Sequence, residues 1–300
     1  MNLNLDEHCA FRRSLSKEVP RIASESPQTF QLNQQLLNHF ITLNEQYSDD
    51  DEVDFDLLYD LVKKGANVNA IDIYGQTILH EAAREWSTDV AKFLVMLGGN
   101  VHATDYFGRA PLHFAAANDY TEMISYLLSQ GADVNIQVRH DSTHCTTVNT
   151  QSPPQNQTPL HFAAGSDAKE ACEVLIEAGA DIEAIDYRGR TPLFIAAELD
   201  RSVSAKYLLE HGANATTKDN SGNMAITIMG SKMPQVCVEA LDQLYAYNRR
   251  NRNQYFFISK LVPSVDEYNH GSRARSILEI IVKEQKLDLI NHTVIQKFIR

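Results

Sequence analysis

Side chains that could bind a zinc ion lie close together in one polar stretch of the sequence. This stretch contains His140, His144 and Cys145, and His161 follows it. Imidazole nitrogens and thiolates are the common ligands of zinc. No C-x-x-C pair accompanies them, however, and His161 belongs to a recurring T-P-L-H motif in which we expect it to be structural. We therefore interpret the stretch as a mobile polar loop and predict no metal site.

A run of four acidic residues, Asp49 to Glu52, is the second candidate for ion binding. It could hold calcium or contact a basic partner, but adjacent acids point in different directions. We expect the run to lie instead at the start of a helix, where the helix dipole favours negative charge. No phosphate-binding loop or G-x-G-x-x-G motif is present, and the other carboxylates scatter over predicted helix faces. The sequence therefore predicts neither a cofactor nor an enzyme.

Composition narrows the classes of partner. The 300 residues carry a net charge of -12, which argues against nucleic acid or an anionic membrane as the partner. No run approaches the ~18 apolar residues of a membrane span, and the amino terminus lacks the apolar core of a signal peptide. The four cysteines show no paired spacing, as in proteins of a reducing compartment. We expect a cytosolic chain with protein partners, and Cys172 as a small core residue.

The dominant feature of the sequence is a period of 33 residues. Four units begin with an aspartate, followed three residues later by a glycine. The step from His113 to His161 is longer than one period by 15 residues, so we expect an insertion loop at 138–157. The aspartate and glycine pairs are Asp72 and Gly75, Asp105 and Gly108, Asp186 and Gly189, and Asp219 and Gly222.

Within each unit the pattern predicts a turn followed by two helices. The threonine before Pro159 or Pro192 can cap the first helix, because its side chain accepts from an early N–H and proline needs no donor at the first position. Pairs of alanines then allow that helix to pack closely. The second helix carries an apolar stripe at helical spacing and ends at a glycine suited to a left-handed conformation. These glycines are Gly65, Gly98, Gly131, Gly179 and Gly212.

The motif D-x-x-G-x-T-P-L-H-x-A-A, with G-A-[DN] at the end of the unit, is similar to that of the ankyrin-repeat family. The resemblance implies an all-α fold, an ankyrin-repeat solenoid in which stacked units bury a common core. We expect about six repeats over residues 29–244, the first and last degenerate, after a flexible lead-in at 1–28. In the first repeat Ser48 is expected to cap the second helix, and in the third Ala110 removes the capping threonine.

A linker region of one strand and two helices is predicted for residues 245–300. The β-prone run Tyr255 to Ile258 predicts a strand at about 254–262, and apolar spacing predicts helices at about 272–285 and 287–300. One face of the last helix is apolar, so we expect something else to pack on it. That face comprises Leu287, Ile290, Val294 and Phe298.

A second resemblance rests on the carboxyl-terminal part of the chain. Short motifs there follow the same order as in the amino-terminal cytosolic region of transient receptor potential cation channels of subfamily A, especially the pyrexia and painless type. Thr293 stands where that family has a proline. The motifs are Lys232-Met233-Pro234, Leu241-Asp242, Phe256-Phe257, Ile290-Asn291-His292 and Phe298-Ile299-Arg300.

This resemblance implies the interaction and gating module of a non-selective, calcium-permeable cation channel that responds to heat, chemical or mechanical stimuli. The module would lie on the cytosolic face of the plasma membrane, contact neighbouring subunits of a homotetramer, and lead into a membrane part beyond Arg300. Leu287, Ile290, Val294 and Phe298 would couple to that part or to a neighbouring subunit. The alternative is a free-standing ankyrin adaptor or scaffold that binds other proteins.

Either function needs a partner-binding surface, which we predict at the turn tips and on the concave face formed by the first helices. Aromatic and arginine side chains contribute a large share of the energy in protein interfaces. The alternative explanation is that these are variable turn positions that tolerate any surface residue. The predicted binding residues are Tyr74, Trp86, Tyr106, Phe107, Tyr120, Tyr187 and Arg188.

Overall fold

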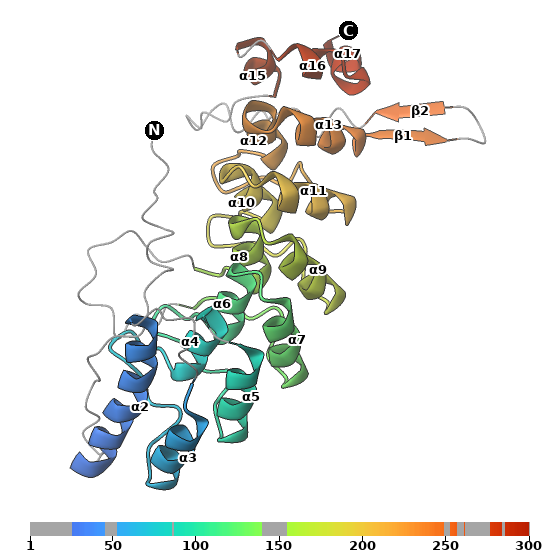
Figure 1. The fold of residues 1–300 in the computed structure, drawn as a ribbon. Coiled ribbons are helices and arrows are strands. Elements are labelled where there is room, and N and C mark those ends of the chain that lie inside the picture. Colours follow the sequence, from blue (N-terminus) through green and yellow to red (C-terminus); the bar gives the residue numbers. More distant parts are fainter. Residues whose placement is uncertain are drawn as a thin grey trace. The chain divides into compact units, whose positions relative to one another are not determined.

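The structure is a computed structural model that describes residues 26–45, 53–85, 87–139, 155–248, 253–256, 261, 277–283 and 286–299. The chain divides into two compact units, Met1–Pro159 and Leu160–Arg300. Helices dominate the described part of both units (Figure 1). The predicted lead-in at 1–28 lies almost wholly outside the described residues, and the predicted domain boundaries stay predictions.

The first unit is built from pairs of helices, each made of a first and a second helix. The pairs are α2 (Pro27–Glu45) with α3 (Phe55–Lys63), α4 (Ile78–Glu85) with α5 (Thr88–Met96), and α6 (Pro111–Ala117) with α7 (Thr121–Ser129). The first helices α4 and α6 lie side by side, and so do the second helices α5 and α7 (Figure 1). The core lies between these layers and contains Leu58, Leu79, Leu94, Leu112 and Leu127, all buried.

The second unit contains helix pairs of the same kind. Its pairs are α8 (Pro159–Ser166) with α9 (Lys169–Glu177), α10 (Pro192–Glu198) with α11 (Ser202–Glu210), and α12 (Ala225–Lys232) with α13 (Pro234–Asp242). Helix α10 packs beside α12, and α11 packs beside both α9 and α13. Cys172 is fully buried in α9, as predicted.

The local signals read from the sequence set most helix ends. All five predicted terminating glycines have positive φ, between 87° and 106°. The Thr191 side chain caps α10 by accepting from the Phe194 N–H at 3.3 Å. Ala110 offers no such side-chain cap to α6, as expected. One prediction is wrong: α3 begins at Phe55, because the Asp54 carboxylate accepts from the Leu57 N–H at 2.9 Å and caps the helix in place of Ser48. Ser48 and the acidic run 49–52 lie outside the described residues.

The end of the second unit differs from the prediction in two ways. The predicted strand at 254–262 is observed as β2 (Asn253–Phe256), which pairs antiparallel with β1 (Tyr245–Asn248), a strand that the sequence pattern did not indicate. The stretch 287–299 forms two helices, α16 (Leu287–Ile290) and α17 (Thr293–Ile299), after α15 (Ile277–Lys283).

A side-chain contact is found at the break before α17. The His292 Nδ1 accepts from the Val294 N–H at 3.3 Å, while its Nε2 lies 3.1 Å from the Asp242 carboxylate in α13. The contact lies at the interruption between α16 and α17, at Asn291 and His292.

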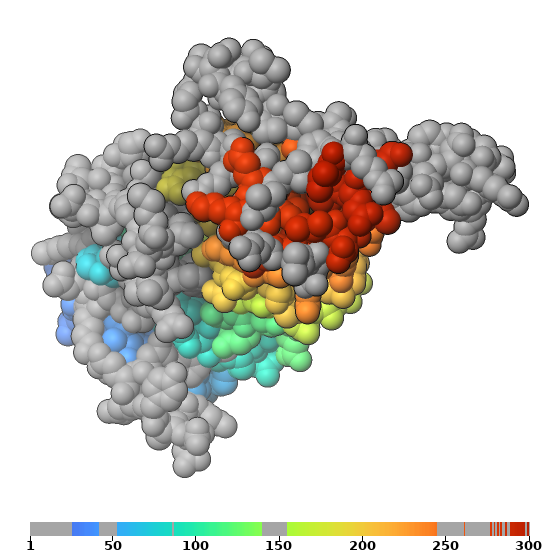
Figure 2. Space-filling model, turned by 90° about the horizontal axis from the view of Figure 1, so that it is seen from above, coloured from blue at the N-terminus to red at the C-terminus, as the bar shows by residue number. Residues whose placement is uncertain are grey.

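The terminal helices cover the last repeat. Helix α15 packs on α12 and α16 packs on α13, and Figure 2 shows the described residues of this segment, in red, lying over the orange repeat helices. Ile277, Ile281 and Leu289 are fully buried by this packing. No helix in the described ranges is both long and apolar enough to cross a membrane.

Candidate partner-binding surface

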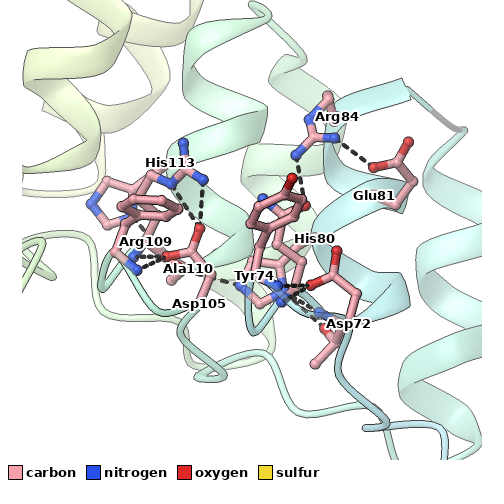
Figure 3. A network of polar contacts seen from close by, with 12 residues as sticks. Asp72, Tyr74, His80, Glu81, Arg84, Asp105, Arg109, Ala110 and His113 are labelled. Atoms are coloured by element: carbon pink, nitrogen blue, oxygen red, sulfur yellow. Dashed lines mark hydrogen bonds and ion pairs between the residues drawn. The ribbon is translucent and has the colours of Figure 1, made fainter. Parts of the chain in front are cut away.

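The turn that opens each repeat is held by its aspartate. The Asp72 Oδ1 accepts from the N–H groups of Tyr74 and Gln76, both at 2.8 Å, and the Asp72 N–H donates to the Gln76 carbonyl at 3.0 Å (Figure 3). Gly75 takes a φ of 78°, which closes the turn at low steric cost. Ile73 and Tyr74 therefore project at a tip whose backbone is fixed by several bonds.

Two of the later turns add a buried ion pair that the sequence analysis missed. Arg109 binds the Asp105 carboxylate through Nε at 2.7 Å, and Arg190 binds Asp186 in the same way at 2.8 Å. Both carboxylates are completely shielded from solvent. The signal was available in the repeated D-x-x-G-R, because aspartate and arginine four residues apart meet across so tight a turn. Buried carboxylates need such partners to remain charged.

Adjacent tips in the first unit are connected to each other. The Tyr106 N–H donates to the Tyr74 carbonyl at 2.9 Å. A Cβ atom at Gly75 would lie 2.7 Å from the Tyr106 ring, so that ring rests directly on the glycine. In the second unit the Asn220 N–H donates to the Arg188 carbonyl at 2.8 Å. The tips of neighbouring repeats therefore form a rigid row in each unit.

The histidine of the T-P-L-H motif joins each repeat to the next turn. The Thr77 N–H donates to the His80 Nδ1 at 3.0 Å, so the ring is neutral and its Nε2–H donates to the Arg109 carbonyl at 3.0 Å. The His113 Nε2 contacts the Gln157 carbonyl at 3.3 Å in the same manner. Burial lowers the pKa of His80 and of His113 to about 4, which keeps both rings neutral near pH 7.

His161 plays the same role in the second unit. Its Nε2 lies 3.0 Å from the Arg190 carbonyl, and burial lowers its pKa to about 4. Its ring is therefore engaged in the repeat, as the motif predicted. The other candidate zinc ligands, His140, His144 and Cys145, lie outside the described residues. Among the residues that the structure does describe, no group of three or more His, Cys, Asp or Glu side chains could hold a metal ion.

A buried polar cluster underlies the tips of the first unit. The Arg84 guanidinium binds the Glu81 carboxylate at 2.6 Å and the Gln76 side-chain oxygen at 3.2 Å (Figure 3). The guanidinium groups of Arg84 and Arg109 lie 4.7 and 4.8 Å from the centre of the Phe114 ring. These contacts are cation–π interactions in a shielded site. The cluster ties α4, α6 and the two turns into one body.

The insertion leaves the base of its turn intact. The Val138 N–H donates to the Gln157 carbonyl at 2.9 Å, and the Asn156 N–H donates to the Val138 carbonyl at 2.8 Å. Asp105 makes the same two bonds, with Arg109 and Gly108, in the preceding turn. Asn156 stands in the glycine position with a φ of 61°. Residues 140–154, which lie outside the described ranges, are therefore added at the tip of an otherwise ordinary turn.

The structure describes four of the five predicted binding residues of the first unit, and three of these four lie at the turn tips. Tyr74, Tyr106 and Phe107 are partly exposed at adjoining tips, and Tyr120 is exposed just before α7. Trp86 lies outside the described residues. In the second unit Tyr187 is partly exposed and Arg188 is exposed, and the Arg188 Nε donates to the Tyr187 hydroxyl at 2.6 Å. No observation here tests whether these residues bind a partner, so the assignment stays a prediction.

The residues predicted to couple to a membrane part are distributed differently. Val294 is fully buried within the second unit and Ile290 is half-buried. The side chains of Leu287 and Phe298 are outside the described set. Val294 therefore stabilises the attachment of α17 and offers no exposed surface to a neighbour in this structure. The coupling role of this face stays a prediction.

Comparison with known families gives one match. A family model described as ankyrin repeats, in three copies, matches residues 50–138 and 140–219, which together are more than half of the 300 residues. A search of curated proteins finds no match. The family match confirms the predicted all-α repeat architecture.

Proposed function

The chain belongs to the ankyrin-repeat family, and from that premise we propose that it is the cytosolic interaction and gating module of a cation channel similar to the transient receptor potential channels of subfamily A. Ankyrin repeats bind protein partners, and proteins of this family are typically not enzymes. The repeat stack supplies the binding function. The channel assignment is the finer step, and it rests on the end of the chain.

One observation supports that finer step above the others. The motifs that resemble the channel family are separated in sequence, yet Asp242 of the second motif and His292 of the fourth lie 3.1 Å apart. Met233 and Pro234 form the tight junction between α12 and α13, on which α15 and α16 pack. A signature spread over distant segments is expected to come together in space if it marks one functional element.

The proposed mechanism assigns a part to each region. The rows of turn tips receive a partner or another stimulus, and the terminal helices pass the change to a membrane part and to neighbouring subunits of a homotetramer. The module would then lie at the cytosolic face of the plasma membrane, next to a calcium-permeable pore. A free-standing adaptor is the second candidate. It is favoured by the turn tips, whose backbones are held by bonds within each repeat and to the next tip, so the surface forms from the repeats alone.

The first experiment is to determine the transcript sequence that follows the codon for Arg300. A reading frame that continues into six apolar segments of about 20 residues would support the channel assignment. A stop codon in every transcript would overturn it and leave the adaptor. A second measurement tests the turn tips as a binding surface independently of the channel assignment. Alanine at Tyr74, Tyr106 and Phe107 should weaken partner binding whether the chain is a channel module or an adaptor.

A further inference from the structure

Exposed apolar side chains gather on the second helices of the first unit, away from the turn tips. Met96 is 70% exposed, Tyr59 50% and Phe55 39%. The Phe55 ring meets the half-buried Phe93 ring edge to face, with centroids 4.9 Å apart. Tyr59 lies one helical turn after Phe55, and Met96 one turn after Phe93, so the four side chains occupy facing sides of α3 and α5. We call Phe55, Tyr59, Phe93 and Met96 the α3–α5 patch.

The repeat period offers an internal comparison for this patch. An aromatic residue recurs at the position of Phe93 in two later repeats, as Tyr126 and Tyr207, but the other three positions are polar in later repeats. In the second unit Lys169 occupies the position of Phe55, and Tyr207 the position of Phe93. The Lys169 ammonium lies 6.0 Å from the centre of the Tyr207 ring. The equivalent residues are Thr88, Lys92, Tyr126 and Ser129 in α5 and α7, and Lys169, Glu173, Tyr207 and Glu210 in α9 and α11.

This comparison shows that the fold does not require the exposed apolar residues. The same positions are occupied by lysine, glutamate, serine or threonine where α9 and α11 or α5 and α7 meet, and those helices pack normally. Exposed phenylalanine, tyrosine and methionine side chains at one place favour association with another surface. The α3–α5 patch is therefore a binding feature added to a repeat, not a consequence of the repeat.

The size of the patch indicates the kind of partner. A stable dimer of globular proteins buries roughly 800 Å² on each partner, contributed by about 20 to 30 residues. Four side chains on two helices fall far short of that. They suit a single amphipathic helix, which binds through a few apolar side chains at helical spacing. The flexible Met96 side chain can adjust to such a helix.

The surrounding charges indicate the sequence of that helix. Asp54, Asp56 and Asp60 are exposed on α3 next to the patch. Two nearby lysines are already engaged, since Lys92 binds Asp89 at 2.8 Å and Lys63 lies over the Tyr59 ring at 5.8 Å. With a net charge of -12, the chain attracts basic partners.

We propose that the α3–α5 patch binds an amphipathic helix of a partner protein whose apolar face is flanked by lysine or arginine. This inference goes beyond the proposed function, because it concerns a surface on the second helices and holds for a channel or an adaptor. The turn tips and the patch would then be separate binding sites on the first unit.

The test uses the full chain and a labelled synthetic helix. The probe is a leucine and lysine peptide of about 18 residues, about five helical turns, with leucine on one face. Binding is measured by fluorescence anisotropy, and the site by carbon-13 labelling of methionine methyl groups. Met96 is the reporter because the other methionines among the described residues are buried. We expect saturable binding that shifts the Met96 signal.

The matched variants introduce the residues that later repeats of this chain carry at the equivalent positions. Tyr59→Lys with Met96→Ser should weaken binding at least tenfold without changing the thermal unfolding midpoint, whereas Ile185→Ser, at an exposed apolar residue of the second unit, should have no effect. Equal binding by the double variant would overturn the proposal, as would equal binding of a leucine and glutamate peptide. A concentration-dependent dimer that the double variant abolishes would show that a second copy occupies the patch, and would also overturn it.

Discussion

His80 and Arg109 are joined by a hydrogen bond of 3.0 Å between the ring Nε2–H of one and the main-chain carbonyl of the other. The bond connects the first helix of one repeat to the turn of the next, and His161 and Arg190 repeat it in the second unit. The Nδ1 of His80 already accepts from the Thr77 N–H, so a second proton on the ring would face a donor. The two bonds that the ring makes together therefore require a neutral histidine.

We expect stability to fall as the solution is acidified from pH 7.5 to 5.5. The folded pKa of His80, His113 and His161 is about 4, below the ordinary 6.5. Between these values the unfolded chain binds more protons than the folded chain, so each histidine costs stability as the pH falls through 6.5. The loss should be about 1 kcal/mol per histidine by pH 5.5. Urea unfolding at several pH values measures it.

A variant separates the histidines from other acid effects. His161→Phe copies Phe194, which occupies the same position in the next repeat. It should be less stable at pH 7.5, because the Arg190 carbonyl loses its donor, but its stability should change less with pH. An unchanged slope would contradict the assignment of the effect to His161.

Arg84→Ala should destabilise the first unit by roughly 3–5 kcal/mol, because it leaves the Glu81 carboxylate buried without its partner. The double variant Glu81→Phe with Arg84→Ala copies Phe114 and Ala117 of the next repeat and should recover most of that stability. Chemical unfolding of both variants is the measurement. A loss under about 1 kcal/mol in the single variant would show that Glu81 is solvated or protonated once Arg84 is gone.

Removal of residues 140–154 should leave the fold intact. The deletion joins Arg139 to Gln155 and restores the spacing of the preceding turn, while the bonds of Val138 to Asn156 and Gln157 remain. We expect an unchanged far-ultraviolet circular dichroism spectrum and an equal or higher unfolding midpoint. A longer deletion, 140–156, leaves only Arg139 between Val138 and Gln157, too short a chain for their main-chain bond, and should lower the midpoint. Equal behaviour of the two deletions would refute the role of the base.

Val294→Asp and Ile299→Asp should differ sharply although they lie five residues apart. Val294 is fully buried, so a carboxylate there should detach α17 and cost at least about 2 kcal/mol. Ile299 is 60% exposed, and its substitution should change stability by under about 0.5 kcal/mol. Thermal unfolding and limited proteolysis at the carboxyl terminus compare them. If the chain is a channel module, only Ile299→Asp is suited to test coupling, since it keeps the helix in place.

The sequence by itself determined the parts of this protein that depend on nearby residues. The 33-residue period placed the helices, Gly98 and Gly131 ended them with positive φ, and Thr191 capped α10. These features depend on backbone sterics and on bonds within one helical turn. All the residues involved are neighbours in the sequence, so a short motif is enough to predict them. The insertion was also located, because the period failed there by a fixed number of residues.

Tertiary structure alone decided what depends on distant partners. The sequence of residues 287–299 favoured one helix, but the structure has two, and Asp242 binds His292 at the interruption between them. The sequence predicted that something packs on the apolar face at Val294, and in the structure this side chain is buried within the second unit itself. Glu81 and Arg84 are buried as an ion pair, with the Arg84 guanidinium over the Phe114 ring, and no local pattern indicated this burial. Each case involves burial or a bond across the fold, and no local pattern encodes where the other partner will lie.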